Sequence, residues 1–423
     1  MTEAAPAVET PTYRGRRRWL LYLAMLGPGV IAANAGNDAG GVITYSSAGA
    51  QFQYRTLFVM VLVTVGLVVV QEMCARLGTF TGKGLAALIR EEFSLRLASF
   101  ALLFLVVANV GLVVSEFAGI GAAMELLGVS RYISVPLAAF AIWALVMFGS
   151  YRYAERLFLL LTLVFLVYPV AAIRAHPDWK QVASDTFLPH LIASRPFVLL
   201  CVALIGTTIT PYMQLYVAAA VADKGLGPED YRYERVDTVG GALLGNVISG
   251  FIIIATGATI GYLGRPLASA QEAAQALRPV AGSASVELFA LGLLGASMLA
   301  GAVVPLSTAY AISEALGVER SVSRSFAEAP LFLSIFSAQI LIGAAVALVP
   351  GNLVNLLVST QELNGLITPV ILVFILVLAN RRSLLGAAAN GPVYRVVATI
   401  AVISVAAMAI TLVVQTVLGW FGV

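Results

Sequence analysis

The sequence predicts an all-α integral membrane protein, and three observations support that prediction. The 423 residues are 60% hydrophobic and 11% charged, with a mean hydropathy of +0.93, whereas a soluble domain carries roughly 25% charged residues. Apolar stretches of about 20 residues, the length of a membrane-spanning helix, recur along the whole chain. Two of these stretches are interrupted by residues that break a helix. The formal net charge of +3 is too small to indicate a nucleic-acid partner.

Eleven apolar stretches are candidate spans, with the lipid bilayer as their expected surroundings. If the arginine-rich N-terminus is cytoplasmic, 18 of the 25 Lys and Arg residues lie on the inner side, in agreement with the positive-inside rule. An odd number of spans then places the C-terminus outside the cell. The approximate centres of the spans are Ala33, Leu67, Gly111, Ala141, Val164, Ile209, Ser249, Leu299, Ile340, Leu366 and Met408.

The first span contains a carboxylate in a sequence that disfavours a continuous helix. Asp38 lies within Asn37-Asp38-Ala39-Gly40-Gly41, and the glycines allow the backbone to unwind there. An ionisable side chain at membrane depth is expensive, so it usually lines an ion or substrate path. Unwound backbone also presents carbonyl oxygens to a cation. The segment therefore predicts a cation site.

The sixth span is interrupted by a proline. Pro211 lies in the segment Thr207-Thr208-Ile209-Thr210-Pro211-Tyr212, where it removes one amide donor and frees a carbonyl about one turn earlier. Taken alone, this segment is equally compatible with an ordinary proline kink, which is common in membrane helices. Because the first and sixth spans are five apart, the pair favours a transporter made of two inverted five-helix repeats with its site at the membrane midplane.

The expected organisation follows from the spans and the longer loops. It comprises a cytoplasmic tail over 1–18, a first repeat over 19–174, an extracellular loop over 175–195, a second repeat over 196–380, and a loop with the eleventh span over 381–423.

Other polar groups indicate no enzyme. His176 and His190 share the first long outer loop with Asp178 and Asp185, and we interpret this group as a solvated loop rather than a metal cluster. The chain has no HExxH or CxxC motif and no histidine in a span, so neither a membrane enzyme nor a cofactor is expected. No obligate protein partner is evident. Glu72 and Arg76, one helical turn apart, are expected to form an i,i+4 pair.

Several short motifs, in their order and spacing, resemble the Nramp (natural resistance-associated macrophage protein) family of metal-ion transporters. The resemblance runs from Gly27 to Gly386 and implies the LeuT-like fold, with spans one to five and six to ten as inverted repeats and an eleventh span. The motifs are Gly27-Pro28-Gly29, the Asp38 segment, Gly49-Ala50-Gln51-Phe52 with Tyr54, Ala75-Arg76-Leu77-Gly78, Thr81-Gly82-Lys83, Pro211, Ser359-Thr360-Gln361 with Thr368-Pro369, and Asn380-Arg381-Arg382 with Gly386.

Departures from the family pattern in two segments bear on the metal. The family's Asp-Pro-Gly-Asn is here Asp38-Ala39-Gly40-Gly41, so Gly41 replaces an asparagine ligand, and Thr210 and Tyr212 stand where the family has methionine and histidine. A thioether favours softer transition metals, whereas a hydroxyl is a hard ligand. A roomier site with one carboxylate suits partly hydrated Mg²⁺. The chain therefore looks most like the Nramp-related magnesium transporters, which move Mg²⁺ and Mn²⁺.

The resemblance also implies a set of metal ligands. Asp38 would be the anionic ligand, joined by the carbonyls of Ala35 and Thr207, the hydroxyl of Thr210 and the side chain of Gln361. For Gln361, a helix-to-helix hydrogen bond is an equally good interpretation. Gly41 would enlarge the cavity, and Tyr212 either faces it or packs. Further candidates for the outer shell, for which structural hydrogen bonding is favoured, are Gln214, Asn364 and Glu362.

The family's proton route is expected to be broken. Of an acidic pair in the third span, Glu116 matches one member and Gly119 stands at the other, and the ninth span, 331–349, has no arginine where the family usually has one. We therefore expect facilitated uptake of Mg²⁺, driven by the ion gradient and the membrane potential. Glu116 either still carries a proton or pairs with Arg76 or another cation.

Two other transporter functions remain open. One is a conventional proton-coupled Mn²⁺/Fe²⁺ symporter, which Gly41 and Thr210 disfavour. The other is a sodium-coupled amino-acid transporter of the same fold, whose first break would offer helix-end amides to a substrate carboxylate rather than hold an aspartate.

Overall fold

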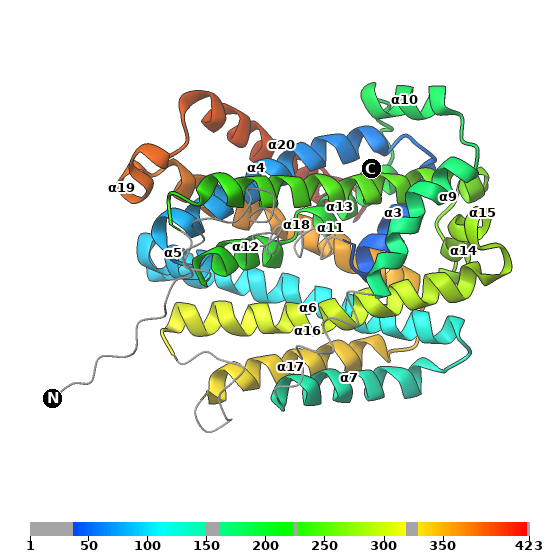
Figure 1. The fold of residues 1–423 in the computed structure, drawn as a ribbon, viewed down its shortest axis with the longest axis horizontal. Coiled ribbons are helices and arrows are strands. Elements are labelled where there is room, and N and C mark those ends of the chain that lie inside the picture. The colour runs from blue at the N-terminus through cyan, green and yellow to red at the C-terminus, as the bar shows by residue number, and fades with distance from the viewer. Residues whose placement is uncertain (1–36, 149–160, 224–226, 319–328, 421–423) are drawn as a thin grey trace, which may run out of the picture.

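The computed structural model describes residues 37–148, 161–223, 227–318 and 329–420, and every regular element in these ranges is helical (Figure 1). The longer helices of the first half are α3 (Ala39–Phe52), α4 (Leu57–Thr81), α6 (Leu95–Leu126), α7 (Arg131–Met147), α11 (Arg195–Thr208) and α12 (Pro211–Asp223). Those of the second half are α13 (Tyr231–Ile260), α16 (Ser285–Leu316), α17 (Pro330–Ala347), α18 (Leu353–Asn380) and α20 (Pro392–Trp420). Short helices are α5 (Leu85–Glu92), η1 (Leu163–Val167), α9 (Tyr168–Arg174), α10 (Trp179–Phe187), α14 (Ala270–Ala274), α15 (Arg278–Ala281) and α19 (Arg382–Leu385).

Helices in the described ranges lie at the positions of the predicted spans. Eight are long and apolar enough to cross a membrane when α11 and α12 are taken as one span, and two shorter apolar segments, Arg131–Met147 and Leu163–Arg174, lie at the predicted fourth and fifth spans. At the first span, α3 supplies only the second half, and Ala33 lies outside the described residues. The count of eleven spans therefore stays a prediction.

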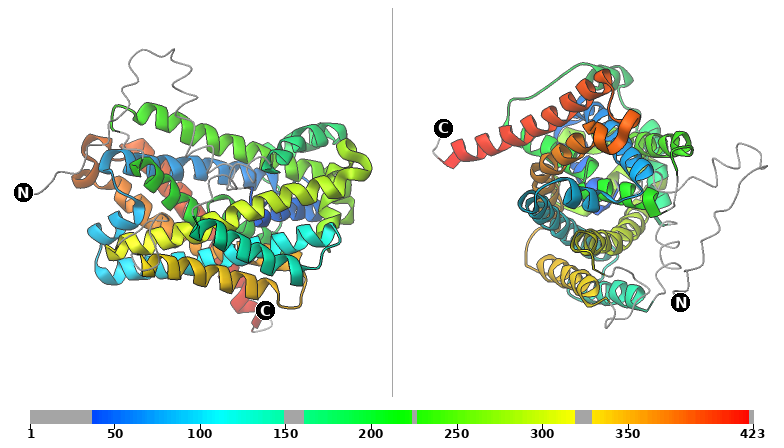
Figure 2. Two further views of the ribbon diagram at one scale, coloured as in Figure 1. Left: turned by 60° about the horizontal axis from the view of Figure 1, so that its bottom comes forward. Right: turned by 90° about the vertical axis from the view of Figure 1, so that its left-hand side faces the viewer.

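The long helices lie side by side in one bundle, with α20 at its edge (Figures 1 and 2). In the apolar window of the α11–α12 segment 89% of the residues are buried, against 28% in that of α20. Exposed apolar side chains cover the outside of the bundle, for example Leu62 on α4, Phe140 on α7 and Ile400 on α20. A large apolar surface of this kind suits lipid rather than water. Because the α11–α12 segment is much more deeply buried than α20, the broken sixth span is a central element of the bundle.

Close backbone contact fixes α11 against α18. A methyl group on Gly206 would overlap the carbonyl oxygen of Gln361 and the amide of Gly365, and one on Gly365 would overlap the carbonyl of Val202. Only glycine has no Cβ, so these positions let two helices approach more closely than larger residues would allow. This contact places the end of α11 directly beside the middle of α18.

A buried polar network joins the end of α4 to the last part of the chain. Glu72 and Arg76 form the predicted i,i+4 ion pair, at 3.2 Å. Glu72 also accepts hydrogen bonds from the hydroxyl groups of Tyr231 and of Tyr394, the latter at 2.6 Å. The Arg76 guanidinium donates to the carbonyl of Ala388 at 3.1 Å and to the Asn390 side chain, and lies over the Tyr394 ring. The network ties α4 to α13 and α20.

We expect Arg76→Ala to destabilise the protein strongly, because it leaves the carboxylate of Glu72 buried without its cation. Breaking a buried ion pair costs about 3–5 kcal/mol. Thermal unfolding of the purified protein in detergent measures the effect. The matched control is Lys83→Ala, which breaks the exposed Lys83–Glu91 pair and should cost about 0–1 kcal/mol. Equal melting temperatures for the two variants would contradict the role of the network.

Candidate functional site

Asp38 caps the buried N-terminus of α3. Its backbone is extended, with φ −67° and ψ 178°, and its Oδ1 accepts a hydrogen bond of 2.6 Å from the amide of Gly41. The residue is only 1% exposed, and Oδ2 has no hydrogen-bond partner in the described structure. The helix dipole and the free amides of the first turn stabilise a negative charge there. The Asp38 carboxylate is therefore fixed through Oδ1, whereas Oδ2 makes no hydrogen bond with any described residue.

Glu116, on α6, lies at the same helix end. Its Oε2 accepts a hydrogen bond of 3.4 Å from the amide of Ala39, while Oε1 is buried without a partner among the described residues. The suggested pairing of Glu116 with Arg76 is wrong, because Arg76 is bound in the network around Glu72. Two carboxylates thus face the first turn of α3.

The residue before this turn is held by α13. Asn37 accepts a hydrogen bond of 3.0 Å from the hydroxyl of Ser249 and donates to the carbonyl of Gly245 at 3.5 Å. These contacts hold the chain at the point where α3 begins. The sequence offered no signal for them, because the partners lie more than 200 positions apart.

The sixth span is broken as predicted, with α11 ending at Thr208 and α12 beginning at Pro211. Residue 211 would supply the amide for the Thr207 carbonyl in a continuous helix, and proline has none. The hydroxyl oxygens of Thr207 and Thr210 are buried without a hydrogen-bond partner in the described ranges. The hydroxyl groups of Thr208 and Tyr45 share a hydrogen bond of 3.1 Å, which links this break to α3.

Side chains of α18 donate hydrogen bonds to other carbonyls of the broken span. Asn364 donates to the Gly206 carbonyl at 2.9 Å, and Thr368 donates to that of Ile209 at 3.2 Å. Asn364 therefore makes the structural hydrogen bond that the sequence favoured. Gln214 does so too, since it donates to the Thr210 carbonyl at 3.4 Å. These contacts supply donors where the helix itself has lost them.

Gln361 lies between α18, α6 and α3. Its Nε2 donates to the Ser115 hydroxyl at 3.4 Å, so the helix-to-helix hydrogen bond exists, but its Oε1 is buried without a partner in the described parts of the chain. A methyl group on Gly40 would overlap the Gln361 amide. The side chain of Gln361 therefore lies against Gly40 in the first turn of α3, and Gly40 is two residues after Asp38.

The two breaks, α6 and α18 carry buried side-chain oxygen atoms that have no hydrogen-bond partner in the described ranges. Tyr212 is also buried near them and is acted on by the charges of Asp38 and Glu116. Gly41 lies in the Asp38 cap, and Ala35 lies outside the described residues. No group of three or more His, Cys, Asp or Glu side chains with a metal-binding arrangement occurs in the described ranges. The oxygens are Asp38 Oδ2, Glu116 Oε1, Thr207 Oγ1, Thr210 Oγ1, Gln214 Oε1, Gln361 Oε1 and Asn364 Oδ1.

The histidine-containing loop lies elsewhere. Asp178 caps α10 by accepting from the amide of Lys180 at 2.9 Å, and His190 lies 2.9 Å from Asp185. Both histidines therefore belong to the loop around α10 rather than to the buried oxygen cluster.

Comparison with known proteins gives consistent matches over most of the chain. The family model for natural resistance-associated macrophage protein-like (Nramp) proteins matches residues 29–415. A divalent metal cation transporter MntH from Acidiphilium cryptum is 25% identical over 399 residues, which cover 89% of this chain and 86% of that protein. Another, MntH 1 from Pseudomonas aeruginosa, is 29% identical over 312 residues, which cover 69% of this chain and 68% of that protein.

A solved structure shows the same fold. A crystal structure of a variant of the Eremococcus coleocola manganese transporter superposes with a TM-score of 0.76 at 20% sequence identity, and the match covers 98% of this chain and 91% of that one. The LeuT-like fold implied by the sequence is confirmed.

Proposed function

We propose that this chain, which belongs to the Nramp family, transports divalent metal cations. Mg²⁺ would be its main substrate, and Mn²⁺ would also be accepted. The relatives named as divalent metal cation transporters support the substrate class. The observation that carries the proposal is the second carboxylate oxygen of Asp38, which is buried at a helix terminus without a protein partner in the described ranges. Such a charge is costly at membrane depth unless a cation balances it.

The ligands would come from both breaks and from α18. Asp38 supplies the charge, Thr207 its carbonyl, Thr210 its hydroxyl and Gln361 its Oε1, with the carbonyl of Ala35 as a further ligand. All are oxygen atoms, which hard cations such as Mg²⁺ prefer. Mg²⁺ gives up its waters reluctantly and commonly binds through one or two carboxylates. A site with one carboxylate and neutral oxygens suits an ion that keeps part of its hydration shell.

Transport would be by alternating access without proton coupling. Glu116, the residual acid, is engaged by the amide of Ala39. Gly119 faces Ala39 and Ser297 so closely that even a methyl group would not fit. The helix α17, which corresponds to the ninth span, contains no arginine. The membrane potential supplies about 2.3 kcal/mol per charge per 100 mV, and roughly twice that for a dication.

The positive-inside rule gives the proposed orientation, with the N-terminus in the cytoplasm. The end of the bundle that carries α9, α10, α14 and α15 (Figure 1) then faces outward, and the end with α5 and α19 faces inward. The protein would be a multi-pass protein of the cell membrane that needs no cofactor or partner protein.

The alternative within the family is a proton-coupled Mn²⁺/Fe²⁺ symporter. One observation favours it, namely that Glu116 Oε1 is buried beside the Asp38 cap without a partner among the described residues. An amino-acid transporter is less compatible, because two of the amides in the first turn of α3, those of Ala39 and Gly41, already donate to the chain's own carboxylates.

We expect Asp38→Ala to abolish uptake of Mg²⁺ and Mn²⁺ into proteoliposomes, because it removes the charged ligand. A metal-sensitive dye inside the vesicles measures the initial rate. Glu287→Ala, which removes an exposed carboxylate from the first turn of α16, is the control and should transport normally. Transport by a correctly folded Asp38→Ala variant at the wild-type rate would eliminate the proposed site.

Thr210→Met should shift selectivity towards Mn²⁺ and Cd²⁺. A thioether is a softer ligand than a hydroxyl, and a gain of about 1.4 kcal/mol would correspond to a tenfold change in relative affinity. Competition of Mg²⁺ against Mn²⁺ uptake measures that ratio. If the variant keeps the wild-type ratio, Thr210 does not contact the ion.

Uptake of Mg²⁺ should leave the internal pH unchanged. We expect no acidification of a pH dye inside proteoliposomes during metal uptake at a fixed membrane potential, and Glu116→Gln should keep most of the transport rate. Acidification that rises in proportion to metal uptake would instead establish the symporter.

A further inference from the structure

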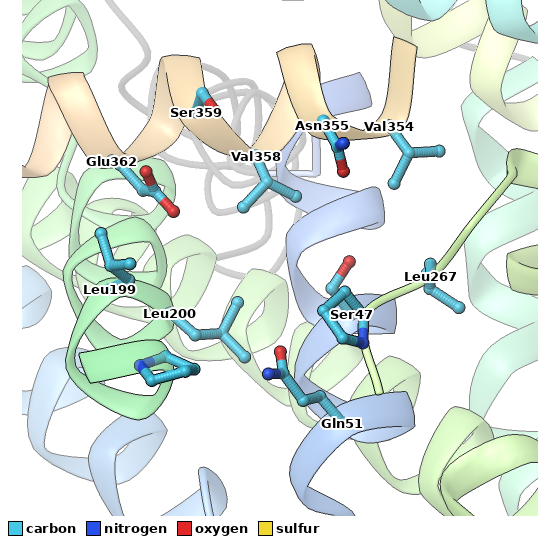
Figure 3. Close-up of a pocket in the computed structure, with 12 residues that line it drawn as sticks. Ser47, Gln51, Leu199, Leu200, Leu267, Val354, Asn355, Val358, Ser359 and Glu362 are labelled. Atoms are coloured by element: carbon cyan, nitrogen blue, oxygen red, sulfur yellow. The ribbon is translucent and has the colours of Figure 1, made fainter. Parts of the chain in front are cut away.

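A cavity lies between α3, α11 and α18, at the ends of these helices that face outward in the proposed orientation. Its volume is about 310 Å³. Figure 3 shows Glu362 and Asn355 extending into it from α18 and Gln51 extending towards them from α3. Asn355 and Ser359 are exposed, so the cavity reaches the surface. Asp38 and Gln361, by contrast, are almost completely buried and do not line it.

The cavity has one carboxylate and several polar groups that the protein does not use. Glu362 forms no ion pair or hydrogen bond with the described residues. The Ser47 side chain is 4% exposed and makes no hydrogen bond within the described ranges, although it lines the cavity. Buried polar groups are nearly always hydrogen-bonded in native structures. A buried hydroxyl group with no partner, beside a carboxylate that forms no ion pair, therefore points to a polar ligand with positive charge.

A stripe of small and polar residues on α3 leads from this cavity to Asp38. Gly40, Thr44, Ser47 and Gln51 recur at helical spacing, so they share one face. Gln51 and Ser47 line the cavity, the hydroxyl of Thr44 is buried without a partner in the described structure, and Gly40 lies against Gln361. At about 1.5 Å per residue, Ser47 lies roughly 13 Å along the helix from Asp38. On α18, Glu362 is the neighbour of Gln361.

We propose that this cavity is an entry site that holds the incoming divalent cation with its water shell, and that Glu362 is its charged group. The proposal rests on the proposed function of the chain as a divalent-cation transporter. The cavity has room for such an ion, because six waters at about 30 Å³ each fill roughly 180 Å³. The amide oxygens of Gln51 and Asn355 and the hydroxyl groups of Ser47 and Ser359 accept hydrogen bonds from bound water. Glu362 attracts the ion without removing its water, which Mg²⁺ releases reluctantly.

Arg195 provides an opposing charge. It is the first residue of α11 and acts on Glu362 through its charge without forming an ion pair with it. A negative charge in a cleft raises the local concentration of cations and their rate of entry. A nearby positive charge, such as that of Arg195, reduces this effect. Loss of Glu362 and loss of Arg195 should therefore change the apparent affinity in opposite directions.

The experiment measures initial rates of Mn²⁺ uptake into proteoliposomes as a function of external Mn²⁺. For Glu362→Gln we expect KM to rise about three- to tenfold with little change in maximal rate, and for Arg195→Gln we expect KM to fall. In the wild type, KM should rise with ionic strength, and this dependence should weaken in Glu362→Gln, since salt screens exposed charges. The matched control, Glu287→Gln, removes an exposed outward carboxylate that does not line the cavity and should leave KM unchanged.

A second measurement separates this proposal from the main site. Purified Asp38→Ala protein should retain weak Mn²⁺ binding, detected by electron paramagnetic resonance, and the double variant with Glu362→Gln should lose it. Such binding would support the entry site even if the preference for Mg²⁺ proved wrong. A Glu362→Gln variant with the KM of the Glu287→Gln control, and weak binding unchanged in the double variant, would overturn it.

Discussion

The arrangement depends on one electrostatic constraint, the negative charge of Asp38 held at the buried N-terminus of α3. The Gly41 amide and the helix dipole stabilise the carboxylate, but no ion pair with a described residue neutralises it. A second carboxylate, that of Glu116, accepts a hydrogen bond from the amide of Ala39 in the same turn. Two acids at one helix end repel each other unless a proton or a cation intervenes. In our proposal, a dication compensates this negative charge.

The interruption of the sixth span is stabilised mainly by side chains of α18, and Gln214 of the span's own second half adds one hydrogen bond. A break at membrane depth exposes backbone carbonyls that no water satisfies, and each costs several kcal/mol if left unpaired. Asn364, Thr368 and Gln214 supply three of the missing donors. Close packing at Gly206 and Gly365 brings α18 near enough to do so. The carbonyl of Thr207, opposite a proline nitrogen, is left for the ion in our proposal.

The features that could be predicted from the sequence are those encoded locally. The break at Pro211 and the Glu72–Arg76 pair follow from the chemistry of neighbouring residues, and the structure agrees with both. Contacts between distant segments could not be predicted in this way. Glu116 meets Ala39 across 77 positions, and its proposed pairing with Arg76 failed because Glu72, Asn390 and Tyr394 surround that arginine. The cavity at Glu362 likewise forms only where α3, α11 and α18 meet.

The two proposed sites, each with one principal carboxylate, suit transport of a hard divalent ion. A cage with many anionic ligands would bind a dication tightly and release it slowly, whereas conduction requires binding strong enough to admit the ion and weak enough to let it leave. At the proposed entry site, retention of the hydration shell would keep the interaction with Glu362 weak. Deeper in the membrane, Gly41 and Thr210 remove an amide and a thioether that would compete with water for the ion. In this proposal, partial dehydration along the polar face of α3 would spread the cost of desolvation over several small steps.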